Sequence, residues 1–112
     1  ASGGILRPVS GTFVGPDAIR FFRKKQADLF FMTVTGLDQS NGLTDPNPLE
    51  IEVKRAMIQA AKQTVLLIDE SKFGVSSLCP VVPLRRIDGL VTDCPNALDR
   101  IPELRSLALE FV

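Results

Sequence analysis

Hydrophobic residues occur in this chain both as short continuous runs and as helical repeats. Residues 28–34 and 64–68 are apolar runs of strand length, and such runs are typical of strands buried on both faces of a parallel sheet. Residues 89–92 predict a third, weaker strand, and residues 107–112 predict a last strand that closes the sheet. Residues 35–48 are rich in Gly, Asp, Asn and Pro and are expected to form a loop.

Three segments show the apolar spacing of helices, namely residues 15–26, 48–63 and 97–107. The second is the clearest, because Asn47 can cap it and Pro48 occupies its first position, where a missing N–H costs nothing. Its buried stripe is expected to consist of Leu49, Val53, Ala56, Met57, Ala60, Ala61 and Thr64.

Strands that alternate with amphipathic helices predict an α/β fold with a mostly parallel sheet. The length of 112 residues suits one domain. No apolar run reaches the roughly 20 residues needed to span a bilayer, and no signal-peptide pattern opens the chain. We therefore expect a single cytoplasmic domain with no membrane partner.

Composition disfavours several kinds of chemistry. Thirteen Lys and Arg residues balance thirteen Asp and Glu residues, so the chain lacks the basic excess that nucleic-acid binding through bulk charge requires. The chain has no histidine, which removes Ser-His-Asp and Cys-His nucleophilic schemes and leaves a zinc site without its usual ligands. Cys79 and Cys94 are interpreted as reduced, partly buried thiols, and neither a metal nor a cofactor is expected.

Polar residues follow the first two predicted strands, where an open α/β sheet binds its ligands. Thr35, Gly36 and Asp38 come after the first strand, and Ser71 and Lys72 come after the second. Glycine lets backbone amides approach an anion, lysine supplies the compact positive charge that a phosphate prefers, and carboxylates accept hydrogen bonds from hydroxyls. The chemistry of this edge suits a phosphorylated polyol.

The same residues also have structural explanations. Lys72 can be a surface lysine, and Asp69 can cap the turn that follows its strand. Glu50 and Lys54 have the spacing of a solvent-facing ion pair on one helix. On spacing alone, the functional and the structural explanations both stand.

Seven short motifs occur in a fixed order over residues 3–93. They are GGILR (3–7), TFVGP (12–16), TGLD (35–38), GLT (42–44), EIEVKRAMI (50–58), DESKFG (69–74) and VTD (91–93). Each motif is weak alone, but the ordered series resembles the C-terminal effector-binding domain of the DeoR family of bacterial transcription regulators.

The resemblance implies a fold and a function. It implies a three-layer domain similar to ribose-5-phosphate isomerase, which responds to phosphorylated sugars or related metabolites. It also implies an oligomeric regulator, often a repressor, that binds operator DNA through an N-terminal winged helix-turn-helix. Effector binding then changes the affinity for DNA.

The resemblance further assigns roles to residues. Ser71 and Lys72 fall on the family's Ser-Lys pair, where the lysine is expected to contact the phosphate. Thr35, Gly36 and Asp38 fall on its turn beside the sugar. Two more positions fall on its E-x-x-x-K segment, Glu50 and Lys54.

Two parts of the family pattern have no counterpart in residues 1–112. One is the winged helix, so this chain is not expected to bind DNA by itself. The other is the first part of the effector domain, with its phosphate-cradling loop. Residues 1–112 are therefore interpreted as one partial effector domain with a half-site, whose exposed apolar surface a second copy could cover.

Two other functions compete with a sensor. A sugar-phosphate isomerase shares the implied fold, but the isomerase family places paired aspartates after the strand that ends near residue 34, and this chain has only Asp38 there. A purely structural oligomerisation module is the second alternative, and it leaves the match at Ser71 and Lys72 unexplained. We expect no enzymatic activity.

Overall fold

A four-stranded parallel sheet forms the centre of the structure, a computed structural model that describes residues 3–7 and 12–112. All three neighbouring pairs of strands run parallel. Across the sheet the order is β3 (Ala27–Met32), β6 (Ala61–Ile68), β8 (Gly89–Thr92) and β9 (Ala108–Phe111). The predicted α/β fold with a mostly parallel sheet is confirmed.

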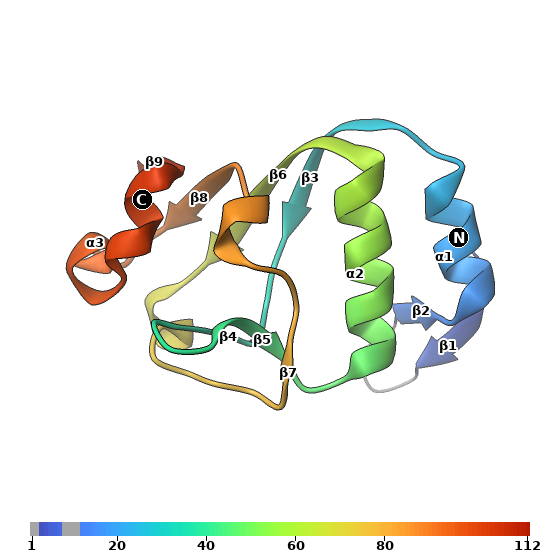
Figure 1. Ribbon diagram of the computed structural model, residues 1–112, viewed down its shortest axis with the longest axis horizontal. Helices are drawn as coiled ribbons and strands as arrows, with labels where there is room; N and C mark the ends of the chain where they lie inside the picture. Colours follow the sequence, from blue (N-terminus) through green and yellow to red (C-terminus); the bar gives the residue numbers. More distant parts are fainter. Residues whose placement is uncertain (1–2, 8–11) are drawn as a thin grey trace.

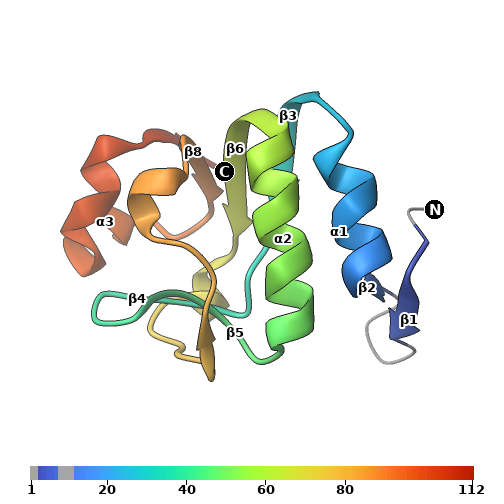
Figure 2. The same cartoon turned by 45° about the vertical axis from the view of Figure 1, so that its right-hand side comes forward.

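Two helices lie side by side in both views (Figures 1 and 2). Helix α2 (Pro48–Ala60) packs on β3 and β6, and α1 (Pro16–Arg23) packs on α2. A short α3 (Ala97–Arg100) and a 3-10 helix (Pro102–Ser106) fill the segment predicted as one helix over 97–107. That helix is interrupted because a proline inside a helix removes a backbone donor and clashes with the preceding turn.

Two small antiparallel sheets were not predicted. Strands β1 (Ile5–Arg7) and β2 (Thr12–Val14) form one of them. The other consists of β4 (Gly36–Asp38), β5 (Gly42–Asp45) and β7 (Cys79–Pro80).

The prediction of a loop over residues 35–48 is therefore wrong, since most of that segment is the β4–β5 hairpin. Leu37 and Leu43 face each other across the hairpin and are both buried. Gly42, with φ of +68°, adopts the left-handed conformation that lets the chain reverse there.

The two faces of the parallel sheet differ in burial. Met32, Leu66 and Leu90 join one core with Ile51 and Ile58 of α2. The opposite face is exposed or half-buried, and we call it the open sheet face. It is formed by Leu29, Phe31, Val65, Leu67 and Val91.

The open sheet face corrects two expectations. Neither residues 28–34 nor residues 64–68 are buried on both faces, because no layer among the described residues covers the face that carries Phe31, which is 55% exposed, and Leu67, which is 37% exposed. Within the described residues, moreover, helices cover a single face, so the architecture has two layers where three were expected.

Helix α2 also differs from its prediction. It ends at Ala60, and residues 61–63 already belong to β6. Leu49 of the expected stripe is exposed, whereas Ile51 and Ile58 are buried against the sheet. The helix has two packing partners, because Val53 contacts the cluster around α1, and a single stripe does not describe such a helix.

The remaining expectations concern thiols and membrane spans. Both cysteines are free; Cys94 is buried and Cys79 is half-buried, as predicted. Within the described part of the chain, no helix is long and apolar enough to cross a membrane.

Candidate functional site

The carboxyl ends of β3, β6 and β8 lie at one edge of the sheet, because these neighbouring strands are parallel. Thr33, Asp69 and Asp93 are the residues that follow the three strands. The backbone N–H of Glu70 donates to Oδ1 of Asp93 at 2.7 Å and joins the ends of β6 and β8. This edge is the place where an open α/β sheet binds ligands.

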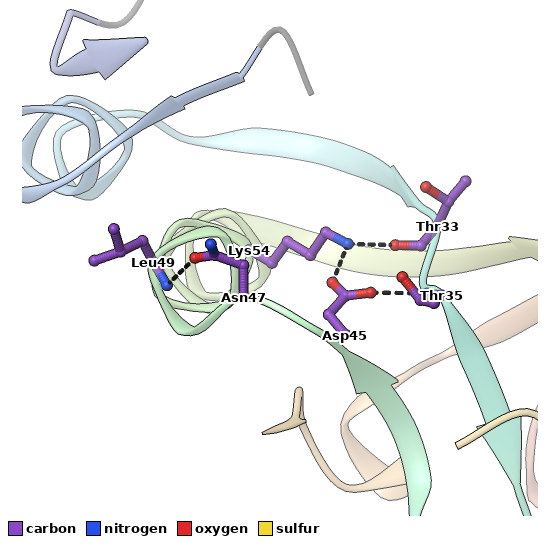
Figure 3. Close-up of polar contacts among 6 residues, drawn as sticks. All are labelled: Thr33, Thr35, Asp45, Asn47, Leu49 and Lys54. Atoms are coloured by element: carbon purple, nitrogen blue, oxygen red, sulfur yellow. Dashed lines mark hydrogen bonds and ion pairs between the residues drawn. The ribbon is translucent and has the colours of Figure 1, made fainter. Parts of the chain in front are cut away.

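A buried carboxylate organises the end of β3 (Figure 3). Asp45, the last residue of β5, is 3% exposed, and its Oδ1 accepts the backbone N–H of Thr35 at 2.7 Å. Its Oδ2 is paired with the ammonium group of Lys54. The same ammonium donates to the backbone carbonyl of Thr33 at 2.8 Å. Asp45 and Lys54 thus fix the chain on both sides of Val34.

The start of α2 sets the position of Lys54. The side chain of Asn47 accepts the N–H of Leu49 at 2.8 Å, and Pro48 follows the cap, as predicted (Figure 3). Because the cap comes directly after β5, the helix carries Lys54 back towards Asp45 about two turns later. Lys54 was expected to form a surface ion pair with Glu50 of the same helix. It instead forms an ion pair with the buried carboxylate of Asp45, which belongs to β5.

A cavity of about 200 Å³ adjoins this cluster, between β3 and α2. Its apolar wall includes Phe30 and Met57, and its polar groups come from Thr33, Glu50 and Lys54. A mostly apolar wall with a few polar groups is the usual character of a small-molecule site.

The end of β6 carries a second polar cluster. Asp69 caps a 3-10 helix (Glu70–Lys72) and accepts the backbone N–H of Ser71 at 2.9 Å. The Ser71 hydroxyl also donates to this carboxylate, and this bond is the main reason why the pKa of Asp69 lies below its ordinary value. Desolvation is the second-largest effect on this pKa and raises it, whereas the Ser71 backbone N–H and the charge of Lys72 lower it by smaller amounts. Asp69 is therefore ionised near neutral pH.

Lys72 offers a free positive charge beside this cluster. Within residues 3–7 and 12–112, its ammonium group has no hydrogen bond or ion pair. The backbone amides of Glu70 and Ser71 are occupied by Asp93 and Asp69. An anion at this place would therefore meet the Lys72 ammonium group and not those amides.

Gly36 lies against the segment that follows Lys72. A Cβ atom on Gly36 would be 2.1 Å from the carbonyl oxygen of Val75. The N–H of Gly74 donates to the carbonyl oxygen of Leu37 at 2.8 Å. This close backbone approach joins β4 to the segment that follows the 3-10 helix after β6.

Asp38 has a different place, at the tip of the hairpin. Its carboxylate accepts the N–H of Ser40 at 3.4 Å and the side-chain amide of Asn41 at 3.1 Å. Asn41 in turn donates to the hydroxyl of Ser76 at 2.9 Å. These bonds give Asp38 a role in shaping the turn.

The expected site residues thus form two groups. Thr35 and Lys54 meet through Asp45, with Glu50 on the adjoining cavity. Gly36 lies alongside the segment after Ser71 and Lys72.

Sequence reasoning missed Asp45, because it fell in the expected loop. The signal was present as an alternation of Leu43 and Thr44 before Asp45 and the helix cap at Asn47. An acidic residue between a strand and a capped helix is well placed to face both elements.

Comparison with known proteins gives a consistent set of relatives. Residues 1–94 match the family model described as the DeoR C terminal sensor domain. The chain is similar to the HTH-type transcriptional regulator GlpR of Haloferax volcanii, with 35% identity over 111 residues that cover 99% of this chain and 44% of that protein. The putative aga operon transcriptional repressor of Escherichia coli O157:H7 is 30% identical over 111 residues, which cover 99% of this chain and 41% of that protein. The glycerol-3-phosphate regulon repressor of Escherichia coli K12 is 28% identical over 94 residues, which cover 84% of this chain and 37% of that protein. The chain spans less than half the length of these relatives.

Proposed function

This chain belongs to the DeoR family of transcription regulators, and on that premise we propose that it senses a phosphorylated sugar for a DNA-binding domain in a longer protein. Ligand binding at the carboxyl edge of the sheet changes the affinity of that regulator for DNA in the cytoplasm. The observation that carries the proposal is the Lys72 ammonium group, which follows a central strand at this edge and, among the described residues, forms no hydrogen bond or ion pair, although it lies near enough to Asp69 to lower the pKa of that carboxyl. The names of relatives that regulate an aga operon and a glycerol-3-phosphate regulon support the ligand class.

Each group of the site has a proposed part. Lys72 contacts the phosphate, because an unpaired ammonium group attracts a dianion most strongly. Ser71 holds the Asp69 carboxylate beside it, where that carboxylate accepts a sugar hydroxyl. The sugar faces Thr35 and Gly36, and Glu50 and Lys54 supply further polar groups beside it, while Asp38 shapes the hairpin turn.

Replacing Lys72 by alanine is expected to weaken binding of sugar phosphates about tenfold or more, because a charge-assisted hydrogen bond is lost. Isothermal titration calorimetry with glycerol 3-phosphate, ribose 5-phosphate and their unphosphorylated parents measures the effect. The unphosphorylated sugars should bind equally to both proteins.

Lys62→Ala is the matched control. It removes the same charge from an ammonium group whose only partner in the described chain is the exposed Asp28, at 3.4 Å, and such a pair contributes at most about 1 kcal/mol. Equal losses of sugar-phosphate affinity in the two variants would show that only the net charge of the chain matters and not the position of Lys72. A wild-type chain that binds no phosphate ester contradicts the proposed function.

Two observations favour a sensor over an isomerase. The relatives are named as transcription regulators. The one carboxylate expected after β3, Asp38, is held at the tip of the hairpin by Ser40 and Asn41. A general base has to reach the proton that it removes, and this carboxylate shapes a turn instead.

We also propose a ribose-5-phosphate isomerase-like fold and self-association. The four-stranded parallel sheet supports the fold, of which the described residues hold only one helical layer. The open sheet face supports self-association, because apolar surface of this kind gains stability when a second copy covers it.

Sedimentation velocity is expected to show a dimer or higher oligomer, and Phe31→Glu should shift it towards the monomer. The substitution places a charge on the most exposed aromatic residue of the open sheet face, where burial in an interface would be costly. Leu78→Glu, at a residue that is 85% exposed outside this face, is the control with the same charge change. A monomeric wild-type protein at high concentration contradicts self-association.

A further inference from the structure

The two charges beside β3 differ in how far they are buried. The side chain of Asp45 is 5% exposed and that of Lys54 is 24% exposed. The carboxylate therefore lies in the interior, while the ammonium group lies at the boundary between the interior and the cavity lined by Lys54. A buried carboxylate is costly unless it is paired and hydrogen-bonded, and Asp45 is both.

The ammonium group retains a hydrogen bond for a ligand. It has three N–H donors. In the described part of the chain, Asp45 accepts one and the carbonyl of Thr33 accepts another. One donor is left for an acceptor in the cavity.

The charge of this donor is already balanced. Because Asp45 neutralises Lys54, the pair attracts a phosphate dianion less than the unpaired Lys72 does. A neutral oxygen acceptor, such as a sugar hydroxyl or carbonyl, suits the remaining N–H of Lys54, and the apolar wall of the cavity suits the carbon skeleton beside it.

We propose that Asp45 is a positioning residue for sugar recognition: it holds Lys54 at the end of β3 so that the remaining N–H donates to a neutral oxygen of the sugar. This inference rests on the proposed function and divides its site into two parts. Lys72 selects the phosphate, and the Asp45–Lys54 pair selects the sugar.

Asp45→Asn tests the positioning role with little change of shape. The amide that replaces the Asp45 carboxylate has one accepting oxygen and one NH₂ group, whereas the carboxylate has two accepting oxygens. The NH₂ group therefore has to face either the Lys54 ammonium group or the N–H of Thr35, and both of these are hydrogen-bond donors that it cannot satisfy. Lys54 is then no longer held beside Thr33. Lys54→Met removes the donor and keeps most of the unbranched side chain.

Calorimetry with the full chain should separate the two parts of the site. Asp45→Asn and Lys54→Met are each expected to weaken binding of glycerol 3-phosphate or ribose 5-phosphate about tenfold, as for the loss of one charge-assisted hydrogen bond. Both variants should bind inorganic phosphate as the wild type does, within about twofold. The double variant should bind no more weakly than Lys54→Met alone, because Asp45 acts through Lys54.

Asp88→Asn is the matched control. Asp88 also accepts a strand amide, the N–H of Thr64 at 2.8 Å, but no ammonium group of the described chain pairs with it. Its replacement should leave the affinity for both sugar phosphates unchanged. If either single variant fails to fold because it leaves a buried group unpaired, the double variant, which removes the whole ion pair, tests the same donor and should lose the same sugar-phosphate affinity.

Three results overturn this inference and leave the proposed function intact: unchanged sugar-phosphate affinity in Lys54→Met, an equal loss of inorganic phosphate binding, or additive effects in the double variant. In each of these the Lys72→Ala variant still loses affinity. Failure of the wild-type chain to bind any phosphate ester overturns the proposed function first, and the sugar-selection role with it.

Discussion

Gly36→Ala is expected to destabilise the chain by about 3 kcal/mol or more, the upper range for forcing an atom into a packed interior. The added Cβ would lie 2.1 Å from the carbonyl oxygen of Val75. That oxygen has little room to retreat, because the N–H of Gly74 bonds to Leu37 and Phe73 forms a bridge with the same residue. Urea denaturation followed by circular dichroism measures the loss as a lower midpoint.

Gly42→Ala separates the clash from the conformational cost of replacing a glycine. Gly42 has φ of +68°, and a Cβ atom added there would meet no other atom within 4 Å. Its replacement carries only the left-handed penalty of about 1 kcal/mol. A larger loss at Gly42 than at Gly36 would contradict the close approach of β4 to Val75.

The parts of the fold that were predicted correctly depend on local chemistry. The cap at Asn47 and the proline after it fix the start of α2 within a few residues of chain. The apolar run at 64–68 identifies β6, since a short continuous apolar run with polar residues on both sides is typical of a strand. These signals are contained in the segments themselves.

The hairpin was not predicted because its stability is not local. Strand β4 has only three residues, and β5 pairs with β7 through Thr44 and Pro80. Short strands of this kind are stabilised by distant partners, and propensity carries little information about them. The composition of residues 35–48 resembles a loop for the same reason.

Burial is the second feature that sequence did not determine. Leu29 and Phe31 are as apolar as Phe30 and Met32, yet only the latter two face the helix-covered side. Hydrophobic residues report a preference for burial, whereas the presence of a covering layer depends on the rest of the assembly. The open sheet face is therefore visible only in the structure.

The candidate site shows the same division. Ser71 and Lys72 are predicted site residues because of their place after a strand and because of the family resemblance. The partner of Lys54 was expected on its own helix at Glu50, but the structure pairs it with Asp45 from β5. A contact between two elements depends on the helix–sheet geometry, which spacing along one helix does not contain.

Leu66→Ala is expected to lower the free energy of unfolding by about 2–5 kcal/mol, which is a large share of the roughly 5–15 kcal/mol that stabilises a typical domain. Leu66 has no exposed surface and lies between Met32 and Leu90 in the register of the sheet. Shortening it leaves a cavity that the three backbone-paired strands prevent from closing. The strand that contains it also leads to Asp69, so loosening it should reduce ligand binding as well as stability.

Leu78→Ala provides the comparison for Leu66→Ala, because Leu78 is 85% exposed and its replacement should change stability by no more than about 0.5 kcal/mol. Thermal and urea unfolding of both variants, with and without a saturating phosphate ester, measure the two effects together. If the ester binds only the folded chain, it should raise the midpoint of Leu66→Ala, since such a ligand stabilises by mass action. Similar losses in the two variants would contradict the placement of Leu66 in the core between the site-bearing strands.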